Sequence, residues 1–190
     1  MFAQAYHPSM RHAGPVRREI GIRTVFNILG PLTNPAAAQR QLIGVAFPEL
    51  GGQMAEVMRV LGSERTLVVH GSGGLDEIAL DGETTVWELR DGQVDRWSFS
   101  PDNTGLGRWT IDDLRGGDPP ASAVMMRRLL DGEGGPIRDA VLLNTAGVLL
   151  AAGAVDKIPD GIQTATKSID SGAARHKLEA LVELSNAVVT

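Results

Sequence analysis

The sequence contains no cysteine, and nowhere does it have an apolar run as long as a membrane-spanning helix requires. Without cysteine there is no disulfide framework and no thiolate chemistry, so we expect a reducing, cytoplasmic environment. A spanning helix needs about 20 consecutive apolar residues. The first residues also lack the pattern of a signal peptide.

Lysine is missing from residues 1–40, although this stretch contains five arginines and only one acid, Glu19. The whole chain has a net charge of −5, which argues against broad nucleic-acid binding. Because a guanidinium binds carboxylates and phosphates through a planar pair of donors, the arginine block indicates an anion site. The alternative is an exposed helix whose arginines are simply solvated.

A proline within the arginine-rich stretch predicts where a helix begins. Pro15 fits the first turn of a short helix over residues 16–22, where its missing N–H costs nothing. Arg17 would then lie near the positive N-terminal end of the helix, which anions favour. His7 and His12 flank the predicted helix.

The pattern of apolar residues predicts an α/β fold. Residues 41–47 and 66–70 are typical of buried strands, and residues 53–61 between them have apolar side chains at helical spacing. A strand–helix–strand unit of this length implies parallel strands and a right-handed crossover. We therefore expect a mainly parallel sheet flanked by helices.

The second half of the chain adds a hairpin and several helices. Asp91-Gly92 predicts the turn of a small antiparallel hairpin insert. Helices are predicted at residues 121–130, 137–152, 162–169 and 173–188. The helix over 137–152 is almost wholly apolar, so we expect it to be buried on nearly all sides. Asn144 is its strongly polar interior residue and needs partners, and we favour a structural hydrogen bond over a catalytic role.

A glycine-rich loop with two acids follows the second predicted strand. It reads His70-Gly71-Ser72-Gly73-Gly74-Leu75-Asp76-Glu77. Ligands in open α/β sheets bind at the carboxyl ends of strands, and glycines allow the backbone to approach them closely. Two adjacent carboxylates can hold a hard cation such as Mg²⁺. The alternatives are the N-terminus of a helix or a solvated surface.

The first stretch resembles the signature segment of the anthranilate phosphoribosyltransferase family. The matching residues are His7-Pro8-Ser9-Met10-Arg11, Pro15-Val16-Arg17 and the run GIRTVFNILGPLTNP from Gly21 to Pro35. The resemblance continues through His70-Gly71 and Gly74-Leu75-Asp76-Glu77-Ile78. It implies a pentosyltransferase of tryptophan biosynthesis, which transfers a phosphoribosyl group from phosphoribosyl diphosphate to the amine of anthranilate and releases diphosphate.

The resemblance also assigns roles to residues. Arg17 would hold the anthranilate carboxylate, and His7, Met10 and Pro31 would line the path of anthranilate. Asp76 and Glu77 would bind Mg²⁺ that is associated with the substrate diphosphate. No residue is identified as a general acid or base.

The resemblance covers the C-terminal part of the family's α/β domain. The family's N-terminal helical bundle and its Gly-Thr-Gly-Gly-Asp loop, which holds the diphosphate, have no counterpart here. We therefore expect residues 1–190 to form a single truncated domain of the nucleoside phosphorylase and phosphoribosyltransferase type, incomplete as a catalyst. The family forms homodimers by this resemblance, and we expect an exposed apolar surface here that promotes self-association.

Two alternative functions stay open at this point. One is an enzyme similar to pyrimidine nucleoside phosphorylase. The other is a non-catalytic relative that binds nucleic acid or a protein partner, which the acidic net charge disfavours.

Overall fold

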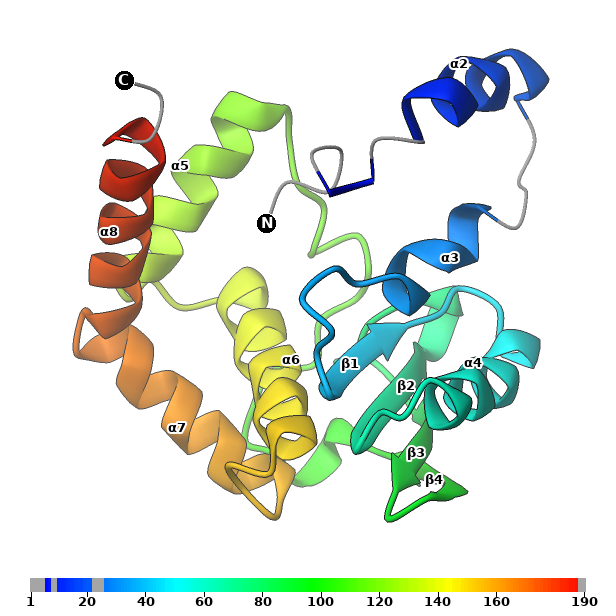
Figure 1. Ribbon diagram of the computed structural model, residues 1–190. Coiled ribbons are helices and arrows are strands. Elements are labelled where there is room, and N and C mark those ends of the chain that lie inside the picture. The colour runs from blue at the N-terminus through cyan, green and yellow to red at the C-terminus, as the bar shows by residue number, and fades with distance from the viewer. Residues whose placement is uncertain (1–5, 8–9, 22–25, 188–190) are drawn as a thin grey trace.

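A four-stranded sheet forms the centre of the computed structural model, which describes residues 6–7, 10–21 and 26–187. Its strands lie in the order β1-β2-β3-β4 (Figure 1). Their bounds are β1 Arg40–Gly44, β2 Arg65–Gly71, β3 Thr84–Arg90 and β4 Gln93–Phe99. The expected α/β fold is confirmed. The sheet is mixed and not mainly parallel as expected, because the hairpin joins the main sheet: among the described strands β1 and β2 are parallel, whereas β2–β3 and β3–β4 are antiparallel.

The hairpin of β3 and β4 forms where the sequence predicted it, and it continues the main sheet through the pairing of β2 with β3. Asp91 and Gly92 both have positive φ angles, 52° and 77°. This backbone suits a two-residue turn whose twist matches that of the strands.

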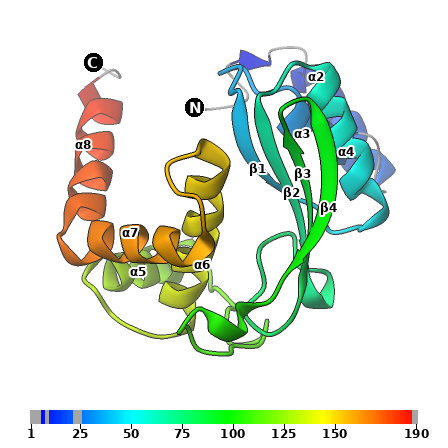
Figure 2. The same cartoon turned by 90° about the horizontal axis from the view of Figure 1, so that it is seen from below.

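Helices cover both faces of the sheet (Figure 2). α4 packs on one face, while α6 packs on the other with α7, α5 and α8 beyond it. The helices are α2 Met10–Ile20, α3 Phe26–Leu32, α4 Glu49–Val60, α5 Pro119–Leu130, α6 Pro136–Ala152, α7 Ile158–Asp170 and α8 Ala173–Ala187, with 3₁₀ turns η1 Ser72–Gly74 and η2 Pro101–Asn103. Within the described residues, no helix is both long and apolar enough to cross a membrane.

β2 is buried on both faces, which is why its sequence is a continuous apolar run. Leu67 and Val69 belong to the core on the α6 side, and Val68 belongs to the core on the α4 side. The α6-side core includes Leu143 from α6 and extends to α7 through Ile162. β2 therefore holds the two halves of the core together.

The helix predicted at residues 16–22 is placed wrongly. α2 begins at Met10 and contains Pro15 in its interior, so Arg17 lies in the second half of the helix and not near its N-terminus. A proline has a helical φ and removes only one N–H, so a helix can continue through it at a cost. Gly21 follows the helix with a φ of 66°, which is typical of a helix end. Residues 22–25 of the predicted stretch lie outside the described residues.

Candidate functional site

Asp76 and Glu77 lie where the parallel strands β1 and β2 end. β1 ends at Gly44 and β2 at Gly71, and both ends are at the same edge of the sheet. After η1 the chain turns back, so that the Gly71 N–H donates to the Leu75 carbonyl at 2.8 Å. The two acids therefore follow the carboxyl end of β2, as predicted, on a loop before β3 and not at the start of a helix.

Two glycines allow the acidic pair to lie directly against the strand ends. A Cβ added to Gly44 would be 1.7 Å from the Asp76 carbonyl oxygen. One added to Gly71 would be 2.5 Å from the Glu77 carbonyl oxygen. Real Cβ atoms do not approach backbone oxygens so closely, so glycine is required at both strand ends for the loop to occupy this place.

Asn144 of α6 holds the loop from the other side. Its Oδ1 accepts from the Ile78 N–H at 2.8 Å, and its Nδ2 donates to the Ile78 carbonyl at 3.2 Å and to the Ala140 carbonyl at 3.0 Å. The structural hydrogen bond expected for Asn144 is thus observed. Its partner is the residue directly after Glu77.

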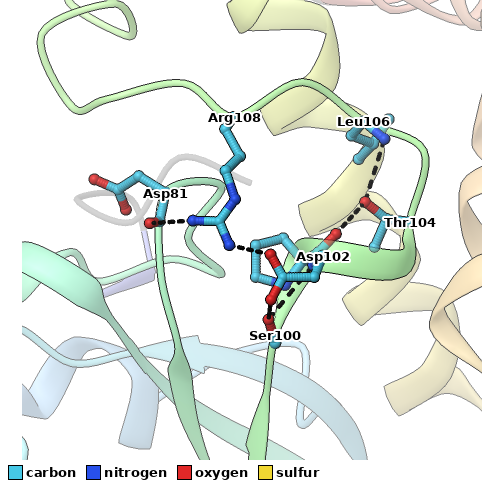
Figure 3. Close-up of polar contacts among 7 residues, drawn as sticks. Asp81, Ser100, Asp102, Thr104, Leu106 and Arg108 are labelled. Carbon is cyan, nitrogen blue, oxygen red and sulfur yellow. Dashed lines mark hydrogen bonds and ion pairs between the residues drawn. The ribbon is translucent and has the colours of Figure 1, made fainter.

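The chain beyond Ile78 is also anchored. The Ala79 N–H donates to the Thr84 hydroxyl at 2.9 Å in the buried interior. Arg108 donates to the Asp81 carbonyl at 3.2 Å and pairs with the Asp102 carboxylate (Figure 3). The Ser72 hydroxyl also donates to the Asp81 carboxylate. The whole return from η1 to β3 is therefore fixed by contacts to other segments.

A cavity of about 810 Å³ opens beside the acidic pair. Its walls come from the end of β1, the loop before β3, the segment from Ile111 to Arg115, and α6. The lining residues are Leu42, Gly44, Val69, Leu75, Asp76, Glu77, Ile111, Leu114, Arg115, Ile137, Ala140, Val141, Asn144, Thr145 and Val148. The expectation that α6 is buried on nearly all sides is wrong along this wall, because Val141 is 38% and Val148 51% exposed. No described segment covers that face of the helix.

The electrostatics of the pair favour a cation. Partial burial of the carboxyl group, and then the charge of Asp76, raise the pKa of Glu77 above its ordinary value. A divalent cation between the two groups would relieve both effects. The donors are carboxylate oxygens, the type that Mg²⁺ prefers, and among the described residues no third acid or histidine gathers with them. Asp76 and Glu77 therefore fit a cation that takes its other oxygens from water or substrate.

The residues assigned to anthranilate belong to α2, to α3 and to the loop before α2. His7 is half-buried on the loop before α2, and Pro31 is half-buried within α3. Met10 and Arg17 are residues of α2, and their side chains are not among the described ones. Neither His7 nor Pro31 lines the cavity, so the structure brings Asp76 and Glu77 together without bringing these residues to them.

The sequence reasoning missed two polar residues of the cavity wall. Arg115 comes from the irregular segment before α5, where it pairs with Asp112 at 2.8 Å. Thr145 follows Asn144 on α6. No motif marks either residue, because only the fold places them beside the acidic loop.

These elements match a known family. Residues 1–175 match the model of the glycosyl transferase family, α/β domain. Because the match covers most of the chain, the protein belongs to this family.

Several similar proteins carry the name anthranilate phosphoribosyltransferase. The chain is 51% identical to an anthranilate phosphoribosyltransferase from Thermomicrobium roseum, over 99% of this chain and 55% of that protein. The crystal structure of anthranilate phosphoribosyltransferase from Thermus thermophilus has a TM-score of 0.85 and 45% identity, covering 93% of this chain and 52% of that one. The Saccharomyces cerevisiae enzyme in complex with PRPP and Mg has a TM-score of 0.82 and 31% identity, covering 91% and 50%. The chain thus spans about half the length of its relatives.

Proposed function

We propose that this chain takes part in phosphoribosyl transfer from phosphoribosyl diphosphate to the amine of anthranilate. The observation that carries the proposal is the Asp76–Glu77 pair at the ends of two parallel strands, beside a cavity, in a chain similar to anthranilate phosphoribosyltransferases along almost its whole length. The structure of the similar yeast enzyme with PRPP and Mg supports the nature of the ligands. A further yeast structure contains 4-fluoroanthranilate.

In this function each group of residues has a separate task. Asp76 and Glu77 would hold Mg²⁺, which when bound neutralises charge that develops on the leaving diphosphate. Arg17 would hold the anthranilate carboxylate through its planar pair of donors. His7, Met10 and Pro31 would line the path of anthranilate. Alignment of the two substrates contributes to the rate without an acid or base from this chain.

The two alternative functions are not favoured, because the relatives named above are all anthranilate phosphoribosyltransferases. A homodimer and a cytoplasmic location stay predictions from the sequence and the resemblance.

Binding measurements test the two parts of the proposal separately. Anthranilate is fluorescent, so its binding can be followed directly, and Arg17→Gln should weaken it by at least about tenfold. Arg18→Gln, the neighbouring arginine, is the matched control and should have little effect. Binding of phosphoribosyl diphosphate should depend on Mg²⁺ in the original chain, and the double variant Asp76→Asn/Glu77→Gln should lose that dependence while it keeps anthranilate binding. Equal effects of the two arginine variants, or Mg²⁺ dependence that survives in the double variant, would contradict the proposal.

A further inference from the structure

Asn144 pairs with the backbone of Ile78 in the way that a strand partner would. One side-chain amide satisfies both the N–H and the carbonyl of Ile78, at 2.8 and 3.2 Å. The amide of asparagine or glutamine carries an acceptor and a donor side by side on one planar group, as a peptide group does. The third bond, to the Ala140 carbonyl at 3.0 Å, fixes the amide on its own helix.

The contact with Asn144 lies opposite the two strand ends. Gly44 and Gly71 leave no space between the strands and the carbonyl groups of Asp76 and Glu77. On the α6 side, a Cβ at Gly147 would be 2.5 Å from the Ile78 Cδ1. Ile78 itself is only 4% exposed. The backbone that carries the two carboxylates is therefore enclosed between the strand ends and α6.

We infer that Asn144 is a positioning residue for the cation site of Asp76 and Glu77. Along an extended chain, the side chains of two adjacent residues point apart. Asn144 holds the backbone after Glu77 so that the two adjacent carboxylates present their oxygens to one ion. The inference rests on the proposed function, because it takes the acidic pair as the cation site.

A general feature of metal sites supports this role. Residues that hydrogen-bond to metal ligands and orient them typically change metal affinity by about 10–100-fold when they are substituted. Asn144 would act in the same sense through the backbone of the residue after Glu77. A binding site keeps its geometry only when packing and hydrogen bonds from surrounding residues hold its ligands in place. A purely structural tether between α6 and the loop would instead affect stability and leave cation affinity unchanged.

The test measures binding of Mn²⁺, a paramagnetic substitute for Mg²⁺, by electron paramagnetic resonance of the free ion. Asn144→Leu removes both bonds to Ile78 and the bond to Ala140, and it keeps the branched shape of the side chain. Thr145→Val is the matched control on the same helix and cavity wall. Ile162→Val, in the core contact of α7, reports what a loss of stability alone does to affinity. The double variant Asp76→Asn/Glu77→Gln defines the site.

The expected result is at least about a tenfold weaker Mn²⁺ affinity in Asn144→Leu, with Thr145→Val and Ile162→Val close to the original chain. Unchanged affinity in Asn144→Leu would overturn the inference and leave the proposed cation site standing. Mn²⁺ binding that is insensitive to the double variant would overturn the cation site itself, and the inference with it.

A second measurement needs no substitution of Asn144. If the contact to Ile78 and the cation support each other, the coupling is reciprocal, so Mg²⁺ must slow hydrogen exchange at the Ile78 amide in the unaltered chain. An exchange rate that stays the same at saturating Mg²⁺ would overturn the inference even if Asn144→Leu did not fold.

Discussion

Glu77 gains a proton more readily than an ordinary glutamate, first because its carboxyl group is partly desolvated and second because Asp76 is adjacent. Asp76→Asn removes the second cause and leaves the first. The pKa of Glu77 should therefore fall in this variant and still stay above its ordinary value. Carbon-13 NMR of the Glu77 carboxyl group over a pH series measures this. A pKa that is unchanged or higher in Asp76→Asn would show that the two carboxylates do not interact.

The same shift has a consequence for stability. A carboxyl group whose pKa is raised by folding binds its proton more tightly in the folded chain. The free energy of unfolding should thus fall as the pH rises from the ordinary glutamate pKa through the raised pKa of Glu77. A bound cation should offset that loss of stability. The affinity of Asp76 and Glu77 for the cation should decrease as the pH falls through the raised pKa of Glu77, because protons compete for the same oxygens.

Glu88 is the acceptor of a small cluster on the sheet. Its Oε1 accepts from Arg65 Nε and Nη2 at 3.0 and 2.7 Å, and its Oε2 accepts from Trp97 Nε1 at 3.0 Å. The Arg65 and Glu88 side chains are only 12% and 17% exposed. Glu88→Ala leaves a guanidinium and an indole N–H without their acceptor, and should lower the free energy of unfolding by about 2–4 kcal/mol in urea denaturation.

The control for that variant is the exposed pair of Arg59 and Glu56 on α4, with an N–O distance of 2.7 Å. Both of these side chains are about half exposed. Glu56→Ala should cost less than about 1 kcal/mol, because water screens the pair and solvates the remaining arginine. Similar losses for Glu88→Ala and Glu56→Ala would show that burial does not decide the strength of the Arg65–Glu88 contact.

At the scale of elements, α4 can lie on the sheet because of one glycine. A Cβ at Gly51 would be 2.2 Å from the Trp87 ring, whereas one at the next residue, Gly52, would be at an ordinary contact distance of 3.5 Å. Gly51→Ala should destabilise the fold by about 1–3 kcal/mol through overpacking. Gly52→Ala should be neutral or stabilising by up to about 1 kcal/mol, because alanine favours a helix.

Thermal unfolding of the two alanine variants is a closely matched comparison, since both substitutions fall in the same helix. The melting temperature should fall for Gly51→Ala and stay or rise for Gly52→Ala. If both variants melted alike, Trp87 would be able to move away from α4, and the packing of this helix on the sheet would not depend on Gly51.

Elements that begin or turn at a characteristic residue could be predicted from the sequence, whereas elements that have no such residue could not. Asp91-Gly92 defines its own turn, and Pro136 marks the first residue of α6. The helix α3 contains Gly30 and Pro31, which are poor helix formers, so no pattern indicated it. In α2 the signal of Pro15 was misleading, because a proline can start a helix or be accommodated within one.

In the candidate site as well, features that depend on neighbouring residues could be predicted, and features that depend on distant residues could not. The position of Asp76 and Glu77 could be predicted because the glycine-rich loop that carries them directly follows a strand. Their role as cation ligands comes from the resemblance and stays a prediction. The bond from Ile78 to Asn144 joins residues 66 positions apart, and no spacing rule connects a polar residue of an apolar helix to a particular loop. The sequence showed that Asn144 needs a partner, and only the fold shows which one.

At the scale of the whole molecule, the cavity leaves one apolar face of α6 uncovered by the described residues. Val148 is 51% exposed there, and it lines the cavity together with Val141 and Ile111. Exposed apolar surface of this kind drives association, so the isolated chain should form dimers or larger species at micromolar concentrations through this face.

Sedimentation velocity over a concentration series measures the association. Val148→Gln should weaken it by about tenfold or more, because a polar group would be buried in the contact. Val182→Gln is the control: Val182 lies on α8 with a similar exposed fraction of 50%, and it does not line the cavity. Equal weakening by both variants would show that the association does not depend on the cavity face of α6. A strictly monomeric unaltered chain would show that the cavity face is stable in water, and the acidic pair beside it would then be open to ligands at every concentration.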